Sequence, residues 1–174
     1  MAHERITHNA LAWGGEEAGV RQTLHVMRDL VKQSDNYRIV KNTAAYLIKD
    51  INPRDYMGQV KAIFDYVQNS MRYVRDINKV EEISAPQIHL RNIAEKGASF
   101  GDCDDYSSLL VSLLRAVGFD TAFSAIATGR KGQVFDHVRA AVRDGGQWVI
   151  LEATAKGRLP GWSLPKVREI MLPL

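Results

Sequence analysis

Residues 1–15 show no clear period, but between residues 17 and 71 apolar side chains recur every three or four positions, the spacing of one face of an α-helix. The pattern predicts helices over roughly 17–33, from residue 39 to near residue 50, and from Asn52-Pro53 onward. Proline is favoured at the first helical position, so Asn52-Pro53 fits a helix start. The apolar positions behind these predictions are Val20, Leu24, Met27 and Val31; Ile39, Val40, Ala44, Leu47 and Ile48; and Val60, Ile63, Phe64, Val67 and Met71.

In the middle of the chain, the residue pattern predicts an extended segment, a loop and two helices. Arg72–Arg75 is expected to be extended and 76–83 to be a loop. Ser84 and Gln87 have the spacing of a capping box around Pro86, which predicts a short helix that ends at Gly97. A strongly apolar helix should follow, with Cys103 in its first turn and Gly118 as its C-terminal stop. Its apolar face consists of Leu109, Leu110, Leu113, Leu114 and Val117.

After residue 120 the pattern changes to that of strands. The predicted strands are Thr121 to Ala127, Val134 to Val142, Gln147 to Ala153 and Arg168 to Leu172. A hairpin loop is expected over 128–132, a tight turn over 144–146 and a Gly/Pro-rich loop over 156–165. Helices first, one central helix next and an antiparallel meander last predict an α+β fold.

Composition narrows the class of protein. The 174 residues fit a single domain over 1–174, with a helical part over 1–70 and the chemistry over 71–174. The net charge of +3 and the lack of a Lys/Arg cluster argue against a nucleic-acid partner. No apolar run has the length of a membrane span, and the first residues lack the apolar core of a signal peptide. We therefore expect a cytoplasmic protein without a membrane partner.

Cys103, the single cysteine of the sequence, is the candidate nucleophile. At a helix N-terminus, unpaired N–H groups and the helix dipole favour the thiolate, the form that attacks carbonyl carbon. Two observations oppose this interpretation. The neighbouring Asp102, Asp104 and Asp105 would raise the pKa of the thiol, and most lone cysteines are inert core residues.

The predicted hairpin brings a base and an acid together. Side chains alternate between the faces of a strand, so His137 and Glu152 share a face, directly opposite or one diagonal apart across the 144–146 turn. The Glu152 carboxylate could then accept the Nδ1–H of His137, and Nε2 would accept the proton of Cys103. Asp136 points to the other face, so we expect it to orient His137 poorly.

Four segments carry a family resemblance: Gly101-Asp102-Cys103-Asp104-Asp105-Tyr106, the run over 113–119, Asp136-His137-Val138, and 148–154. Together they resemble the transglutaminase-like superfamily, which has a papain-like core. The resemblance extends from about Tyr73 to Trp162 and implies a Cys103 nucleophile, a His137 base and an acid at Glu152, where the family pattern has Asp. It also implies a peptide or amide substrate and no cofactor. The helical front half resembles small phage or prophage members, which suggests a phage-encoded, virion-associated protein.

The other candidate residues have weaker support. The backbone N–H of Cys103 is the natural first oxyanion donor. The superfamily often places an aromatic or Gln side chain upstream, so Tyr73 is a candidate second donor, with a core tyrosine as the alternative. Asp102 could touch substrate or simply cap its helix. His89 is expected to be a surface or satisfied histidine.

Alternatives to a peptidase or amidase remain open. The same chemistry with an amine acceptor gives a transglutaminase that crosslinks protein. A non-catalytic phage-associated module on the same fold is a second alternative. A metal site built from Cys103, His137 and a carboxylate is disfavoured because the sequence lacks typical ligand spacing.

Overall fold

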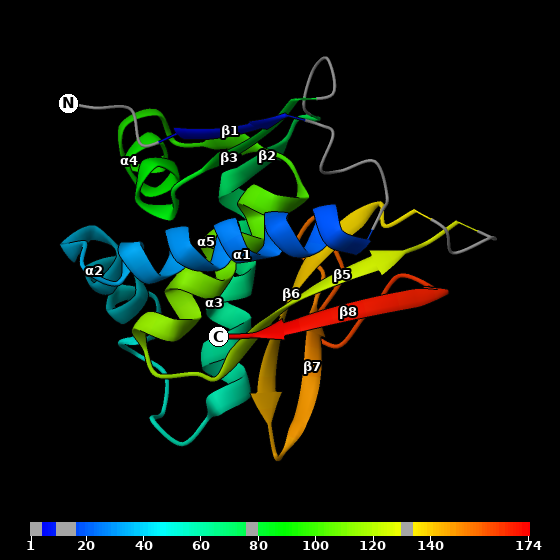
Figure 1. Ribbon diagram of the computed structural model, residues 1–174. Helices are drawn as coiled ribbons and strands as arrows, with labels where there is room; N and C mark the ends of the chain where they lie inside the picture. Colours follow the sequence, from blue (N-terminus) through cyan, green and yellow to red (C-terminus); the bar gives the residue numbers. More distant parts are fainter. Residues whose placement is uncertain (1–4, 10–16, 76–79, 130–133) are drawn as a thin grey trace.

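The computed structural model describes residues 5–9, 17–75, 80–129 and 134–174. Five helices and eight strands occur in these ranges, and their order confirms the α+β class (Figure 1). The helices are α1 Glu17–Ser34, α2 Arg38–Ile48, α3 Tyr56–Ser70, α4 Pro86–Lys96 and α5 Cys103–Ala116. The strands are β1 Arg5–Asn9, β2 Met71–Tyr73, β3 Val80–Ser84, β4 Ser99–Gly101, β5 Thr121–Ala127, β6 His137–Asp144, β7 Gln147–Leu151 and β8 Arg168–Pro173.

Helix α5 is the centre of the fold. Every residue from Cys103 to Leu114 is buried. Helices α1, α2, α3 and α4 contact it, and so do strands β5 and β6 of the main sheet. The predicted stop at Gly118 is confirmed: Gly118 has φ 92°, its N–H bonds to the Arg115 carbonyl, and the Phe119 N–H bonds to the Leu114 carbonyl. This pair of bonds is a Schellman motif, which needs the left-handed conformation that glycine adopts readily.

The helices before α5 match the predicted pattern, except at one start. Helix α3 begins at Tyr56, and the Asp55 side chain caps it by accepting from the Gly58 N–H at 2.9 Å. Asn52 instead stabilises a separate turn, where its side chain accepts from the Arg54 N–H. The predicted start at Asn52-Pro53 is therefore wrong by one turn, because Asp55 offers a second and better placed cap.

Two predictions between residues 76 and 87 are also wrong where the structure describes them. Part of the expected loop is strand β3, which pairs antiparallel with β1. The capping box does not form: Ala85 is the N-cap and Pro86 opens α4. The backbone N–H of Ser84 is bound by the Asp105 carboxylate of α5, a contact that local spacing cannot reveal. Residues 130–132 of the expected hairpin loop lie outside the described residues.

The main sheet has the strand order β7-β6-β5-β8, and all its pairs are antiparallel. Strands β6 and β7 meet at the two-residue turn Gly145-Gly146, where both residues have positive φ, 54° and 86°. This is the combination that a type I′ hairpin turn requires. The register pairs Asp144 with Gln147 and Ala140 with Leu151. Carried past the end of β7, it would set Glu152 opposite Arg139, one diagonal from His137.

The helical part lies on one side of this sheet, and the small β1–β3 and β2–β4 pairs lie beyond the N-terminal end of α5 (Figure 1). Parallel pairing of β2 with β4 sets Tyr73 beside Gly101, directly before the helix that begins at Cys103. Among the described helices, none has the length and apolar character needed to cross a membrane.

Replacing Gly146 should test the hairpin. The Gly146→Ala variant should lose about 1 kcal/mol of unfolding free energy, because an L side chain is strained at positive φ. Chemical denaturation measures the loss. Gly129→Ala is the matched control, since Gly129 has open space around it and no positive φ. Equal stability of the two variants would contradict the turn geometry.

Candidate active site

The candidate nucleophile is held at the start of α5. Cys103 is the first residue of the helix and is 7% exposed. Asp102 is the N-cap: its carboxylate accepts from the Asp104 N–H at 3.0 Å, and its carbonyl accepts the Tyr106 N–H. The thiol therefore lies at the positive end of a long buried helix, where a thiolate is stabilised.

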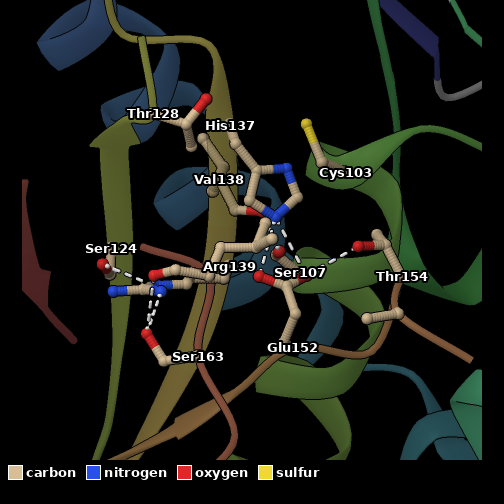
Figure 2. Close-up of polar contacts among 12 residues, drawn as sticks. Cys103, Ser107, Ser124, Thr128, His137, Val138, Arg139, Glu152, Thr154 and Ser163 are labelled. Atoms are coloured by element: carbon tan, nitrogen blue, oxygen red, sulfur yellow. Dashed lines mark hydrogen bonds and ion pairs between the residues drawn. The ribbon is translucent and has the colours of Figure 1, made fainter. Parts of the chain in front are cut away.

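The predicted contact between His137 and Glu152 is present. His137 Nε2 lies 2.9 Å from both carboxylate oxygens of Glu152 (Figure 2). Glu152 is 1% exposed and His137 is mostly buried. An ionised carboxylate can only accept, so the ring carries its proton on Nε2 and donates it to Glu152.

The nitrogen assignment predicted from the sequence is wrong. Nε2, not Nδ1, meets the carboxylate, and Nδ1 lies on the side of the ring where Figure 2 shows the thiol of Cys103. The diagonal register explains why Nε2 rather than Nδ1 contacts the carboxylate. Diagonal partners in a sheet are about 7–8 Å apart, so the contact uses the distal nitrogen of the ring and the longer of the two acidic side chains.

Thr154 supports the acid, a contact that the sequence interpretation did not assign. Its hydroxyl donates to Glu152 Oε1 at 2.6 Å (Figure 2). That oxygen therefore accepts from both the imidazole and the hydroxyl, which fixes the plane of the carboxylate. The signal in the sequence was the placement of Thr154 two residues after Glu152 within one of the matching segments.

Tyr73 lies close to the nucleophile, as its strand pairing requires. The Val74 N–H bonds to the Gly101 carbonyl at 2.9 Å, and the Tyr73 ring centroid is 6.3 Å from that of Tyr106 in α5. Burial, followed by the nearby charges of Cys103 and Asp102, raises the pKa of Tyr73 from 10.0 to about 12. The residue still keeps 44% of its surface exposed. Its raised pKa keeps the hydroxyl protonated beside the start of α5.

His89 is a satisfied histidine, as expected, but it is fully inside the protein. Its Nε2 bonds to Asp105 Oδ1 at 3.1 Å, and its Nδ1 lies 2.9 Å from the Ser99 hydroxyl. The same Asp105 oxygen accepts the Ser84 N–H. A Cβ at Gly101 would lie 2.3 Å from Asp105 Oδ2, so this carboxylate occupies the space that a side chain at position 101 would need.

Two charged residues near His137 have structural partners. Asp136 accepts from the N–H and hydroxyl of Thr128 at 2.9 and 2.6 Å, so it closes the β5–β6 connection and leaves His137 to Glu152. The buried Arg139 guanidinium donates to Ser124, Ser163 and Glu169 (Figure 2). It ties β6 to β5, to β8 and to the segment that follows Glu152. No pattern in the sequence predicted that Arg139 would be buried.

Potential metal ligands also occur at the helix start. Asp102, Cys103 and Asp104 each offer an atom within 4.8 Å of the others. Asp102 is already engaged as the helix cap, and Cys103 Sγ lies 3.6 Å from Asp104 Oδ1. The three side chains therefore lie close together because they surround the N-terminus of α5.

A separate hollow of about 710 Å³ lies at the other end of α5. It is lined by residues of α2, α3 and their connection, of the segment after α5, and of the end of β6 with the turn that follows, among them Ile48, Tyr56, Phe119 and Arg143. None of the candidate site residues lines it.

A family model covers the stretch of chain that holds Cys103, His137 and Glu152. Residues 32–153 match the model of the transglutaminase-like superfamily. The chain belongs to this superfamily, which confirms the resemblance seen in the sequence. No curated protein matches the sequence.

The chain is similar to several solved structures, and the first of these shares its fold. A candidate protease from Parabacteroides distasonis superposes with a TM-score of 0.58 at 17% identity, over 76% of this chain and 26% of that one. A candidate cysteine protease from Cytophaga hutchinsonii gives a TM-score of 0.47 at 16% identity, over 98% and 62% of the two chains. Legionella pneumophila LapG, treated with EGTA, gives 0.48 at 16% identity, over 76% and 73%. The chain thus spans about a quarter of the first structure and less than two thirds of the second.

Alkaline pH should reveal the environment of Tyr73. The unfolded chain releases this proton near pH 10.0, whereas the folded protein retains it to about 12. Between these values the unfolded state binds fewer protons, so the free energy of unfolding should fall as pH rises. Denaturation across this interval should show a smaller fall for Tyr73→Phe than for the wild type.

The control for this titration is Tyr46→Phe, since Tyr46 is 66% exposed and distant in sequence from the site. It should lose stability as the wild type does. A Tyr73→Phe variant that also follows the wild-type curve would place Tyr73 in an ordinary solvated environment.

Proposed function

We propose that this protein is a cysteine-dependent acyl-transfer enzyme that hydrolyses peptide or amide bonds through Cys103, His137 and Glu152. The observation that carries the proposal is the imidazole of His137. Its Nε2 is fixed by the buried Glu152 carboxylate at 2.9 Å, while its Nδ1 is on the side of the thiol (Figure 2). A base oriented by a third group beside a nucleophile is the arrangement that covalent catalysis requires.

In the proposed mechanism, His137 Nδ1 accepts the thiol proton and the Cys103 sulfur attacks the carbonyl carbon of the substrate. The resulting imidazolium donates its proton to the leaving amine, which departs as the tetrahedral intermediate collapses to a thioester. Water then attacks the thioester with His137 as the base, releasing the acid and the free thiol. Glu152 stabilises the imidazolium and keeps the ring oriented in both halves of the reaction.

The developing oxyanion needs hydrogen-bond donors. We assign the backbone N–H of Cys103 as the first, because it lies at the N-terminus of α5. Tyr73 is the second, because its raised pKa keeps the phenol protonated and it lies beside the segment that leads into Cys103. Asp102 acts as the cap that holds the Cys103 backbone in this position.

Membership of the superfamily and the shared fold support a cysteine enzyme in general terms. Hydrolysis and crosslinking differ only in the acceptor that attacks the thioester, water or an amine. Profiling with peptide-amide electrophiles would identify the acyl side of the substrate. Mass analysis of products, with and without an added amine, would then identify the acceptor.

Loss of the nucleophile should abolish the reaction but leave the fold. We expect Cys103→Ala to have no turnover on any substrate found by profiling. Its thermal melting should stay close to that of the wild type, because the side chain loses a single sulfur atom at a helix end. Full turnover in this variant would exclude the proposed mechanism.

Removing the imidazole of His137 should change the reactivity of Cys103. We expect His137→Ala to raise the pH at which iodoacetamide alkylates Cys103, since the imidazolium no longer stabilises the thiolate. The readout is specific because the sequence has one cysteine. Asp136→Asn is the control, because Asp136 directly precedes His137 but its carboxylate binds Thr128. This variant should leave the alkylation profile unchanged. An unchanged alkylation profile in His137→Ala would show that His137 and Cys103 do not interact.

The length of the acid at position 152 should matter. Glu152→Gln loses the charge and presents an amide to Nε2, so kcat/KM should fall by more than tenfold with a smaller effect on stability. Glu152→Asp keeps the charge but is about 1.5 Å shorter. It should retain only part of the activity, because the diagonal contact needs the full reach. Wild-type kcat/KM in Glu152→Gln would show that another group orients His137.

A further inference from the structure

A side chain of helix α3, which is far away in the sequence, forms hydrogen bonds with the segment that follows Glu152. Gln68 of α3 donates from Nε2 to the Ala155 carbonyl at 3.0 Å and accepts the Gly157 N–H on Oε1 at 3.1 Å. Its side chain is 7% exposed. We infer that Gln68 is a positioning residue: it holds the turn that follows Glu152 and thereby keeps the Glu152 carboxylate in contact with His137 Nε2. This inference rests on the proposed function.

The acid needs such support because it lies just beyond the sheet. Strand β7 ends at Leu151, and Glu152 opens a turn closed by the bond from the Ala155 N–H to the Glu152 carbonyl at 3.3 Å. The next turn is closed by the Arg158 N–H on the Ala155 carbonyl, and Gly157 has φ 76°. Both backbone groups that Gln68 binds belong to these two turns, and Thr154, which supports the carboxylate, lies between Glu152 and Ala155.

Gln68 itself is held firmly. Val67, before it in α3, and Met71, the first residue of β2, are fully buried, and α3 passes directly into β2, which carries Tyr73. The amide therefore links the strand with the proposed oxyanion donor to the turn with the acid. An amide suits this position because it offers a donor and an acceptor at once, whereas a carboxylate offers acceptors only.

Removing the amide would take one of two hydrogen bonds from the Ala155 carbonyl, which keeps the Arg158 N–H, and would take the Gln68 partner from the Gly157 N–H. A backbone group that loses a partner moves to find water or another partner, since leaving it unpaired is costly. The turn would shift, and with it the carboxylate that His137 Nε2 contacts through both oxygens. The imidazolium would lose part of its stabilisation, and the thiolate of Cys103 would form at higher pH.

The same helix offers a matched control. Gln59 is also 7% exposed and also binds backbone, donating from Nε2 to the Asn52 and Pro53 carbonyls at 3.2 Å each. It lies about 13 Å along α3 from Gln68, at 1.5 Å per residue, and it holds the α2–α3 connection. Loss of either amide costs similar bonds, but only Gln68 reaches the turn that bears Glu152.

The experiment compares Gln68→Leu with Gln59→Leu in the full chain. Thermal melting should fall by similar amounts in both. The pH profile of Cys103 alkylation with iodoacetamide should move to higher pH only in Gln68→Leu, with a several-fold slower reaction at neutral pH. Gln68→Glu keeps the acceptor for the Gly157 N–H and loses the donor, so it should fall between the wild type and Gln68→Leu, and it serves if Gln68→Leu fails to fold.

A second comparison separates this inference from the proposed function. Glu152→Gln should move the profile more than Gln68→Leu does, and adding Gln68→Leu to Glu152→Gln should move it no further, because both changes act through the same carboxylate. If Glu152→Gln moves the profile but Gln68→Leu behaves like Gln59→Leu, the positioning role is wrong and the proposed function stands. If Glu152→Gln leaves the profile unchanged, both are wrong.

Discussion

The burial of α5 on every side is the constraint from which the site follows. A helix enclosed by four helices and a sheet has little freedom to move, so its first residue, Cys103, is fixed in space. Burial also requires each polar group near the helix start to find a partner within the protein. Asp102 caps the helix, and Asp105 binds the Ser84 N–H and His89. The polar contacts around the nucleophile are therefore a direct result of enclosing the helix.

The identity of the acid depends on the hairpin. The two-residue turn at Gly145-Gly146 sets a register in which Glu152 lies diagonally across from His137. The longer carboxylate and the distal ring nitrogen together span this diagonal, so that Glu152 reaches His137. Thr154 donates to the same carboxylate, and Gln68 binds the backbone of the turn that follows Glu152.

The sequence predicts much of this fold because its strongest signals are local. Helical spacing located α1, α2 and α5, and strand alternation placed His137 and Glu152 on one face. Apart from the start of α3, where Asp55 supplies a local cap, the failures involve partners far apart in the chain. The expected cap at Ser84 lost its backbone N–H to Asp105, 21 residues later, and the grip of Gln68 on Ala155 spans 87 residues. Which ring nitrogen meets the acid depends on an exact register, which alternation alone leaves open by two residues.

The single sulfur of the chain has a consequence for oxidation chemistry. A thiolate at a helix N-terminus can be oxidised to sulfenic acid, and such a group is normally rescued by a second thiol that forms a disulfide with it. This sequence contains no second cysteine. Recovery of an oxidised Cys103 must therefore come from a thiol supplied in solution, so the redox state of the surroundings would set how much of the protein keeps its nucleophile.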